Sequence, residues 1–161
     1  MDKHLTFRFC SQNDVPLILK FVKKLAKYVK LLDNVVATEI LLAENLFNKR
    51  YAEVIIAELD SKPIGFALYF HNFSTFLGKP GIFIEDLFIE EEYRGNGFGK
   101  EILTFLARLA VDRDCGRLEW SVLDWDEKAI NFYKSIDASP MDESTVYRLD
   151  GAKLTGLAQQ Y

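Results

Sequence analysis

The stretch IFIEDLFIEEEYRGNGFGK, residues 82–100, sets the fold that the rest of the chain must complete. Its first part, Ile82–Ile89, is an apolar run of the kind that forms a buried strand. Its second part is a glycine-rich turn, and a helical pattern begins near Gly97. A strand that turns through glycines into a helix presents backbone N–H groups at the helix N-terminus, where an anion can bind. The stretch therefore predicts a ligand that carries phosphate.

The spacing of the glycines distinguishes between known phosphate-binding loops. A P-loop needs G-x-x-x-x-G-K-[ST], but Gly95 and Gly99 are one residue too close, and Glu101 replaces the hydroxyl that binds Mg²⁺. A dinucleotide fingerprint needs G-x-G-x-x-G at the start of a fold, whereas this loop follows earlier strands and has its third glycine one place early. The pattern Arg-x-x-Gly-x-Gly matches at Arg94, Gly97 and Gly99. A tight turn without a ligand is the alternative.

The composition predicts one compact domain, residues 1–161. Hydrophobic residues make up 49% of the 161, which is enough for a substantial core. The net charge of −4 disfavours nucleic acid, and no apolar stretch is long enough to cross a membrane. Cys10 and Cys115 have no metal-binding spacing, so we expect no metal and two reduced thiols in a cytoplasmic protein. A disulfide between them is the alternative.

Hydrophobic periodicity predicts a mixed sheet with helices on its faces, an α/β (α+β) fold in the order β-α-α-β-β-β-α-β-α-β. A hairpin turn is expected at 60–62 and another turn at 78–81. Apolar side chains that we expect to face inward on the second helix are Ile40, Leu41, Leu46 and Phe47, and Gly116 is expected to end the third in a left-handed conformation. Strands are expected at 5–9, 52–59, 63–70, 82–89, 118–123 and 145–149, and helices after Asp14, after Thr38, from Gly97 and at 125–136.

Three ordered segments resemble the GNAT superfamily of N-acetyltransferases, and together they cover nearly the whole chain. The segment RGNGFG, 94–99, is similar to the acetyl-CoA loop of that superfamily, and EDLFI, 85–89, occupies the strand before it. The segment WDEKAINFY, 125–133, is similar to the W-N-E-P-x-x-x-F-Y block, most closely to that of the spermidine/spermine (diamine) acetyltransferase branch. The segment LAKY, 25–28, also resembles that branch.

The resemblance implies a strongly twisted sheet, splayed open between the strand of Glu85 and the strand of Leu118. The pantetheine arm of acetyl-CoA would lie in the opening and pair with the backbone of Leu87 and Ile89, while loop N–H groups would hold the pyrophosphate. The branch also implies a homodimer. The residues that the resemblance places at the cofactor are Leu87, Phe88, Ile89, Arg94, Gly95, Asn96, Gly97, Phe98, Gly99, Lys100, Asp126 and Ala129.

Acetyl transfer to an amine needs a proton acceptor and a group that protonates the leaving thiolate. An alkyl ammonium has a pKa of about 10.4 and must lose a proton before it can attack. We expect Glu85 to be the base or the ammonium anchor, with Asp86 on the opposite face of the strand as a substrate-binding or structural residue. Tyr133 would be the acid, and Tyr28 would line the acceptor pocket. An internal ion pair of the carboxylates and a core role for Tyr133 are the alternatives.

The function predicted from these residues is acetyl-CoA-dependent transfer of an acetyl group directly to a primary amine of a small molecule. Candidate acceptors are a polyamine, a diamine or a lysine-like amino acid. A protein or peptide acetyltransferase and a non-catalytic CoA-binding module are the alternatives. Departures from the branch at Val29 and at residues 73–76 leave the acceptor open. Asp126 and Lys128 replace the family's Asn and Pro, and Asp137 replaces a glycine at the end of the helix, where an aspartate can adopt the left-handed conformation.

Overall fold

The computed structural model describes residues 4–161, and the chain divides into two compact units. The first unit ends at Ser121 and the second begins at Val122. The first contains the strands β1 (Thr6–Phe9), β2 (Glu53–Leu59), β3 (Lys62–Ser74), β4 (Lys79–Ile89) and β5 (Leu118–Trp120), and the helices α1 (Val15–Tyr28), α2 (Glu39–Ala43) and α3 (Phe98–Asp112). The second contains α4 (Glu127–Ser135) and α5 (Gly151–Ala158).

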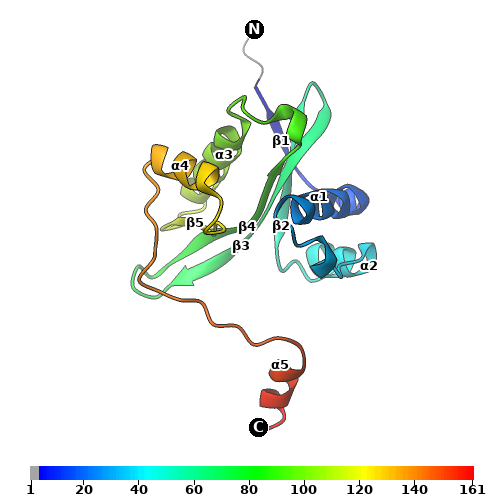
Figure 1. Ribbon diagram of the computed structural model, residues 1–161, viewed down its shortest axis with the longest axis vertical. Helices are drawn as coiled ribbons and strands as arrows, with labels where there is room; N and C mark the ends of the chain where they lie inside the picture. Colours follow the sequence, from blue (N-terminus) through cyan, green and yellow to red (C-terminus); the bar gives the residue numbers. More distant parts are fainter. Residues whose placement is uncertain (1–3) are drawn as a thin grey trace. The chain divides into compact units, whose positions relative to one another are not determined.

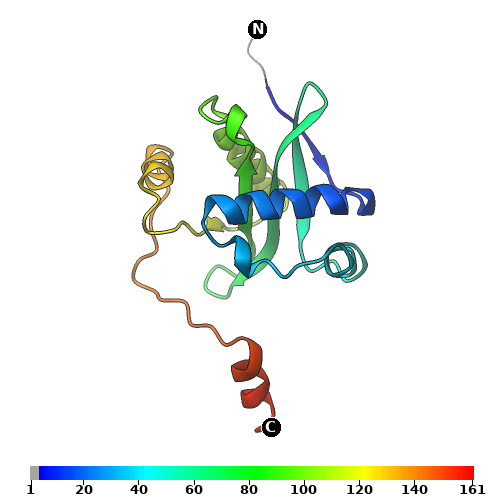
Figure 2. The same ribbon diagram turned by 45° about the vertical axis from the view of Figure 1, so that its right-hand side comes forward.

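The first unit is a five-stranded sheet in the order β1-β2-β3-β4-β5, with α1 and α2 on one face and α3 on the other (Figures 1 and 2). Neighbouring strands are antiparallel except β4 and β5, which are parallel because α3 connects them. The β2–β3 turn has positive φ at Asp60 (50°) and Ser61 (64°), as the twist of a two-residue hairpin requires. The predicted fold class is confirmed.

Aromatic packing fixes α1 on the sheet beside the C-terminal end of β4. The rings of Phe21 on α1 and Phe66 on β3 stack with centroids 5.5 Å apart, and Phe88 on β4 lies 5.9 Å from Phe21. All three side chains are buried in one cluster with Ile18 and Ile56. Burying an aromatic side chain of this size contributes about 2–3 kcal/mol, so this cluster holds the strand that carries the candidate carboxylates.

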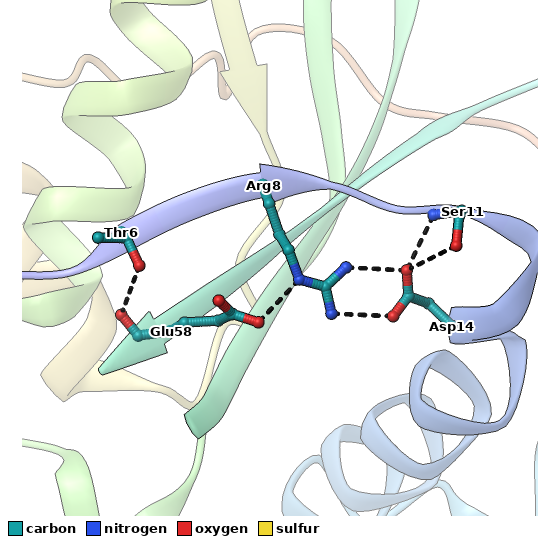
Figure 3. Close-up of polar contacts among 5 residues, drawn as sticks. All are labelled: Thr6, Arg8, Ser11, Asp14 and Glu58. Atoms are coloured by element: carbon teal, nitrogen blue, oxygen red, sulfur yellow. Dashed lines mark hydrogen bonds and ion pairs between the residues drawn. The ribbon is translucent and has the colours of Figure 1, made fainter. Parts of the chain in front are cut away.

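An ion-pair network joins β1, β2 and the start of α1 (Figure 3). The Arg8 guanidinium donates two hydrogen bonds of 2.9 Å to the Asp14 carboxylate and one of 2.7 Å to Glu58. Asp14 also accepts a bond from the Ser11 N–H, 2.8 Å long. Arg8 lowers the pKa of Asp14, since its hydrogen bonds favour the charged carboxylate. The network fixes the entry into α1 and lies apart from the glycine turn in sequence.

Helix α4 of the second unit has clear capping interactions. The Asp126 carboxylate accepts a 3.1 Å hydrogen bond from the Ala129 N–H at the N-terminus of the helix. Asp137 follows the helix with φ of 62°, the left-handed conformation that the sequence predicts for the residue replacing glycine. Every residue from Ser139 to Tyr161 is exposed, including those of α5.

Two of the predicted strands differ from the structure. Residues 145–149 form no strand, and β5 ends at Trp120 rather than at residue 123. A strand needs a hydrogen-bonded neighbour, and none pairs with residues 145–149 within the described chain. The turn expected at 78–81 lies earlier, because Lys79 already belongs to β4.

Two helix predictions also need correction. The left-handed residue after α3 is Asp114 (φ 54°) and not Gly116, where a Cβ would lie 2.8 Å from Leu77 Cδ1, the end of an exposed side chain. Ile40 is 82% exposed and Leu41 is 50% exposed, although both were expected to face inward. Helix α2 has five residues and continues as a π-helical turn, Glu44–Asn48, so a 3.6-residue period does not describe it. Inward packing is confirmed for Leu46 and Phe47, and Thr38 caps α2 as expected.

Candidate active site

Strand β4 leaves half of one edge without a neighbouring strand in the described part of the first unit. Its parallel pairing with β5 ends at Ile84 and Trp120, whereas β4 itself continues to Ile89. Residues Asp86 to Ile89 therefore pair with β3 alone, and Glu85 has no pairing partner on either neighbouring strand. Backbone groups along such an edge can bind an extended ligand as an added strand. This is the opening that the sequence predicts between the strand of Glu85 and the strand of Leu118.

A β-bulge at Glu85 changes the faces that its neighbours occupy. Ile84 pairs with Tyr69, and Asp86 pairs with the adjacent Leu68, so Glu85 is the extra residue on β4. Leu68 and Tyr69 are adjacent on β3, so their side chains point to opposite faces of the sheet. Their partners Asp86 and Ile84 therefore also point to opposite faces. In a regular strand, two residues separated by one other would point to the same face. The side chains of β4 therefore do not alternate strictly between the two faces at Glu85. The prediction that Glu85 and Asp86 face opposite sides depended on that alternation, so it loses its basis. Asp86 lies on the α1 face of the sheet.

The two carboxylates have different environments. Asp86 is half-buried, and this burial, with a smaller contribution from the negative charge of Glu85, raises its pKa to about 6. Glu85 is exposed. A carboxylate that titrates near neutrality can accept a proton and release it again at physiological pH. The sequence predicts a base at this pair, and the pKa of Asp86 is raised into that range.

The glycine turn forms an open cradle at the start of α3. Gly95 and Gly97 have φ of 81° and 82°, a left-handed conformation that other residues rarely adopt. No side chain caps the N-terminus of α3. The first backbone hydrogen bond of the helix is donated by the Glu101 N–H to the Gly97 carbonyl. The N–H groups of residues 98–100 therefore precede the helical pattern. A Cβ built at Gly95, Gly97 or Gly99 would meet no atom within 4 Å, so the space beside these glycines is open.

Arg94 holds this turn against the end of β4. Its Nε donates a 2.8 Å hydrogen bond to the carbonyl of Ile89, and its guanidinium lies 4.6 Å from the ring centroid of Tyr28 and 5.4 Å from that of Phe88. Such cation–π contacts contribute about 0.5–2 kcal/mol. The structure thus joins two residues that the sequence assigned to different ligands, Arg94 to the cofactor and Tyr28 to the acceptor. Spacing along the chain gives no signal for this contact.

The other residues of the first unit that were predicted to contact the cofactor differ in how exposed their side chains are. Phe88, Ile89 and Phe98 are 5–7% exposed, so their side chains pack in the core and only their backbone groups can reach a ligand. Leu87 is half-buried and Lys100 is exposed. Two further side chains support the turn from within the protein, because Asn96 Nδ2 donates to the Tyr93 carbonyl at 2.9 Å and Glu101 accepts from the Leu5 N–H at 2.9 Å.

The second unit carries Tyr133, Asp126 and Ala129. Tyr133 is half-buried on α4, with its ring centroid 5.5 Å from that of Phe132. Asp126 and Ala129 are bonded to each other by the helix cap, so the carboxylate that replaces the family's asparagine retains a capping function. Within residues 4–161, no group of three His, Cys, Asp or Glu side chains could hold a metal ion, and no helix could cross a membrane.

Comparison with known proteins agrees with this geometry. The model of the Acetyltransferase (GNAT) family matches residues 27–137. L-ornithine N5-acetyltransferase from Arabidopsis thaliana is 33% identical over 93% of this chain and 86% of its own length. Thialysine N-epsilon-acetyltransferase from Bos taurus is 32% identical over 94% of this chain and 95% of its own. An integron cassette protein from the mobile metagenome of V. cholerae has a TM-score of 0.80 and 29% identity over 99% of both chains. The chain therefore belongs to the GNAT family, near its diamine branch, and is an N-acetyltransferase.

Proposed function

We propose that this enzyme transfers the acetyl group of acetyl-CoA directly to a primary amine of a small molecule. The acceptor is a polyamine, a diamine or a lysine-like amino acid. The observation that carries this proposal is the open edge of β4 from Glu85 to Ile89, which leads from two carboxylates into the glycine cradle. Relatives named for ornithine and thialysine, each an amino acid with a side-chain amine, support the choice of acceptor.

The cosubstrate would extend along β4 from the carboxylates to the glycine turn. Backbone groups of Leu87 and Ile89 would pair with the pantetheine arm, and the N–H groups of residues 98–100 would bind the pyrophosphate. The positive end of the α3 dipole would add to this attraction. Arg94 would act mainly by holding the turn in place, since its Nε already donates to the Ile89 carbonyl.

The acceptor amine would bind as an ammonium ion near Glu85 and Asp86. We assign the role of base to Asp86 because its pKa is about 6. Its carboxylate accepts a proton from the ammonium ion, directly or through water, and this frees the lone pair of the nitrogen. The nitrogen attacks the thioester carbonyl, a strand N–H stabilises the oxyanion, and the C–S bond breaks as the C–N bond forms. Tyr133 donates its hydroxyl proton to the leaving thiolate. As the tetrahedral intermediate collapses, the attacking nitrogen releases its second proton to solvent, and the Tyr133 oxygen is reprotonated from solvent. The products are an amide and the free CoA thiol.

We infer further that both units serve one acetyltransferase domain, residues 1–161, since the family match at 27–137 includes parts of each. We also propose that the enzyme is a cytoplasmic homodimer that acts without nucleic acid or membrane. Cys10 and Cys115 are both free thiols, in keeping with a reducing compartment.

A panel of amines, assayed by release of the free CoA thiol from acetyl-CoA, tests the proposed reaction. We expect turnover with diamines, polyamines or lysine-like amino acids, and none with lysine-containing peptides. Turnover restricted to peptides would instead support a protein acetyltransferase. Binding of acetyl-CoA without turnover on any amine would support a non-catalytic CoA-binding module.

Replacing Gly99 with Ala tests the cradle without straining the fold. Gly99 is the glycine of the turn that has ordinary φ and open space around a Cβ, so the substitution is expected to leave the free energy of unfolding unchanged or to raise it by about 0.5–1 kcal/mol. The added methyl group would occupy the space of the pyrophosphate, and we expect the KM for acetyl-CoA to rise about tenfold. The control is Gly156→Ala in α5, where the space is equally open. An unchanged KM would show that the cradle does not hold the cosubstrate.

A further inference from the structure

The face of the sheet on which α1 packs carries a strip of side chains that begins at Asp86. Leu68, the β3 partner of Asp86, contacts the buried cluster beneath α1. Two residues further along β3, on the same face, is Phe70, whose partner on β4 is Phe83. These two rings lie 5.4 Å apart between centroids, and both side chains are half-buried. An apolar surface therefore follows the carboxylate along this face.

A polar cluster on β5 and the far part of β3 ends this strip. Glu119 pairs with Phe83, and its Oε1 accepts a 3.1 Å hydrogen bond from Asn72 Nδ2. The Nε atom of Arg117 lies 2.7 Å from the same oxygen, and the two charged side chains are 38% and 31% exposed. Gly81 leaves room for the cluster, since a Cβ there would lie 2.5 Å from Asn72 Oδ1 and 3.0 Å from Arg117 Cγ. The strip thus ends in a guanidinium and a carboxylate placed side by side.

Two buried atoms of this polar cluster have no hydrogen-bond partner within residues 4–161. They are Asn72 Oδ1 and Arg117 Nε, the second of which lies close to Glu119 but is not aligned to donate to it. A buried polar atom without a partner costs about 1–3 kcal/mol. A ligand explains the retention of such a cluster better than stability does, because the unbonded atoms destabilise the fold.

We propose that Arg117 and Glu119 bind the α-carboxylate and the α-ammonium group of an amino-acid acceptor whose side-chain amine lies at Asp86. This assignment rests on the acetyl transfer proposed above and selects one of its acceptor classes. Glu119 lies one strand from β4 and two β3 residues along the sheet from Asp86, so their Cα atoms are about 8 Å apart. About 6 Å separates the side-chain nitrogen of an extended lysine from its Cα. The methylene groups between these ends would contact Phe70 and Phe83.

The guanidinium of Arg117 distinguishes an amino acid from a diamine. An amino acid presents a carboxylate and an ammonium group together, and each would meet the opposite charge at Arg117 and Glu119. A guanidinium also binds a carboxylate through two parallel hydrogen bonds. A diamine or polyamine has only a further ammonium group to offer, which Glu119 would attract and Arg117 would repel. The cluster therefore favours acceptors that carry an α-carboxylate.

Two matched pairs of amines, which differ only in the α-carboxylate, test this assignment. The release of CoA thiol is measured with L-lysine against cadaverine and with L-ornithine against putrescine. We expect kcat/KM to be at least about tenfold higher for the amino acid of each pair. Arg117→Gln should remove most of this preference by raising the KM for the amino acid, with kcat changed less than about twofold, because the guanidinium lies away from the reacting nitrogen.

Two further variants show whether the charge of Arg117 is the cause. Arg117→Lys keeps the positive charge without the planar guanidinium, so it should restore part of the preference. The matched control is Arg108→Gln on α3, which removes an arginine that is 76% exposed and paired with Asp112 at 2.9 Å. This control should leave the preference unchanged. An equal kcat/KM within each pair, or a preference that Arg117→Gln does not reduce, would overturn the assignment.

Calorimetric titration of L-lysine into the protein saturated with CoA tests binding without acetyl transfer. We expect the Kd to rise at least about tenfold for cadaverine, and for L-lysine in Arg117→Gln. L-lysine methyl ester removes the carboxylate charge without any change to the protein, so it gives the same test if Arg117→Gln does not fold. Equal Kd values for L-lysine and its ester would also overturn the assignment. Lysine binding that depends on Arg117, with no turnover of any amine, would contradict only the proposed reaction.

Discussion

Replacing Tyr133 with Phe is expected to lower kcat by about 10²–10³-fold, the range for loss of a general acid. The substitution removes one oxygen atom and keeps the ring that packs beside Phe132, so the helix should be unaffected. Without the hydroxyl, the CoA thiolate must leave unprotonated. Since we propose that β4 and the glycine turn make the nucleotide and pantetheine contacts, the Kd for acetyl-CoA should change less than about threefold.

Steady-state kinetics and equilibrium titration with acetyl-CoA together measure this effect. Tyr51→Phe is a suitable control, because it removes a hydroxyl from an exposed tyrosine, 69% accessible, and should leave kcat unchanged. Unchanged turnover in Tyr133→Phe would remove this residue from the mechanism. It would also support the alternative that Tyr133 is a core aromatic residue of α4.

The second large effect is expected at the carboxylate pair. Asp86→Asn should lower kcat/KM for the amine by about 100-fold at pH 7.5, because the proton acceptor and one negative charge are both lost. In the unchanged protein, kcat/KM should fall as the pH decreases through about 6, where Asp86 becomes protonated. Glu85→Gln removes the negative charge that contributes to the raised pKa of Asp86, so this acid limb should move to lower pH.

The pH profile of Glu85→Gln distinguishes the two carboxylates. If Glu85 were the base, Glu85→Gln would abolish the acid limb instead of shifting it, and Asp86→Asn would retain it. The sequence-based assignment of Glu85 as base would then be correct, and Asp86 would be the substrate anchor.

Asp86→Asn should also stabilise the protein at pH 7.5. A carboxyl group whose pKa is raised by burial destabilises the folded state when it is charged. This destabilisation is fully present above pH 6 and disappears as the pH falls towards 4, because the group becomes protonated in the folded protein. A shift from about 4 to about 6 corresponds to at most about 3 kcal/mol, and less for a group that solvent still reaches. Urea unfolding should therefore show a stabilisation by the substitution at pH 7.5 that diminishes at pH 4. A loss of stability at pH 7.5 would show that charged Asp86 has a favourable partner in the fold.

Local sequence signals predicted most elements where a short-range cause exists. The left-handed turn at Asp60 and Ser61, the cap at Thr38 and the left-handed end at Asp137 all follow from the chemistry of neighbouring residues. The predictions were wrong where the conformation depends on residues outside the segment itself. Ile40 and Leu41 face outward because a π-helical turn follows them, and residues 145–149 form no strand because the described chain supplies no neighbour.

By itself, the sequence determined the family and predicted a place for the cosubstrate, since the strand, the glycine turn and the helix that would build that place are contiguous from residue 82 onward. Tertiary structure decided which carboxylate has a pKa near neutrality and which residues hold the turn. The bulge at Glu85 comes from the pairing of β4 with β3, and the raised pKa of Asp86 comes from its burial in the folded chain. The contact of Arg94 with Tyr28 likewise joins residues 66 positions apart. Register and burial are properties of neighbouring strands and helices, and no pattern within a single segment records them.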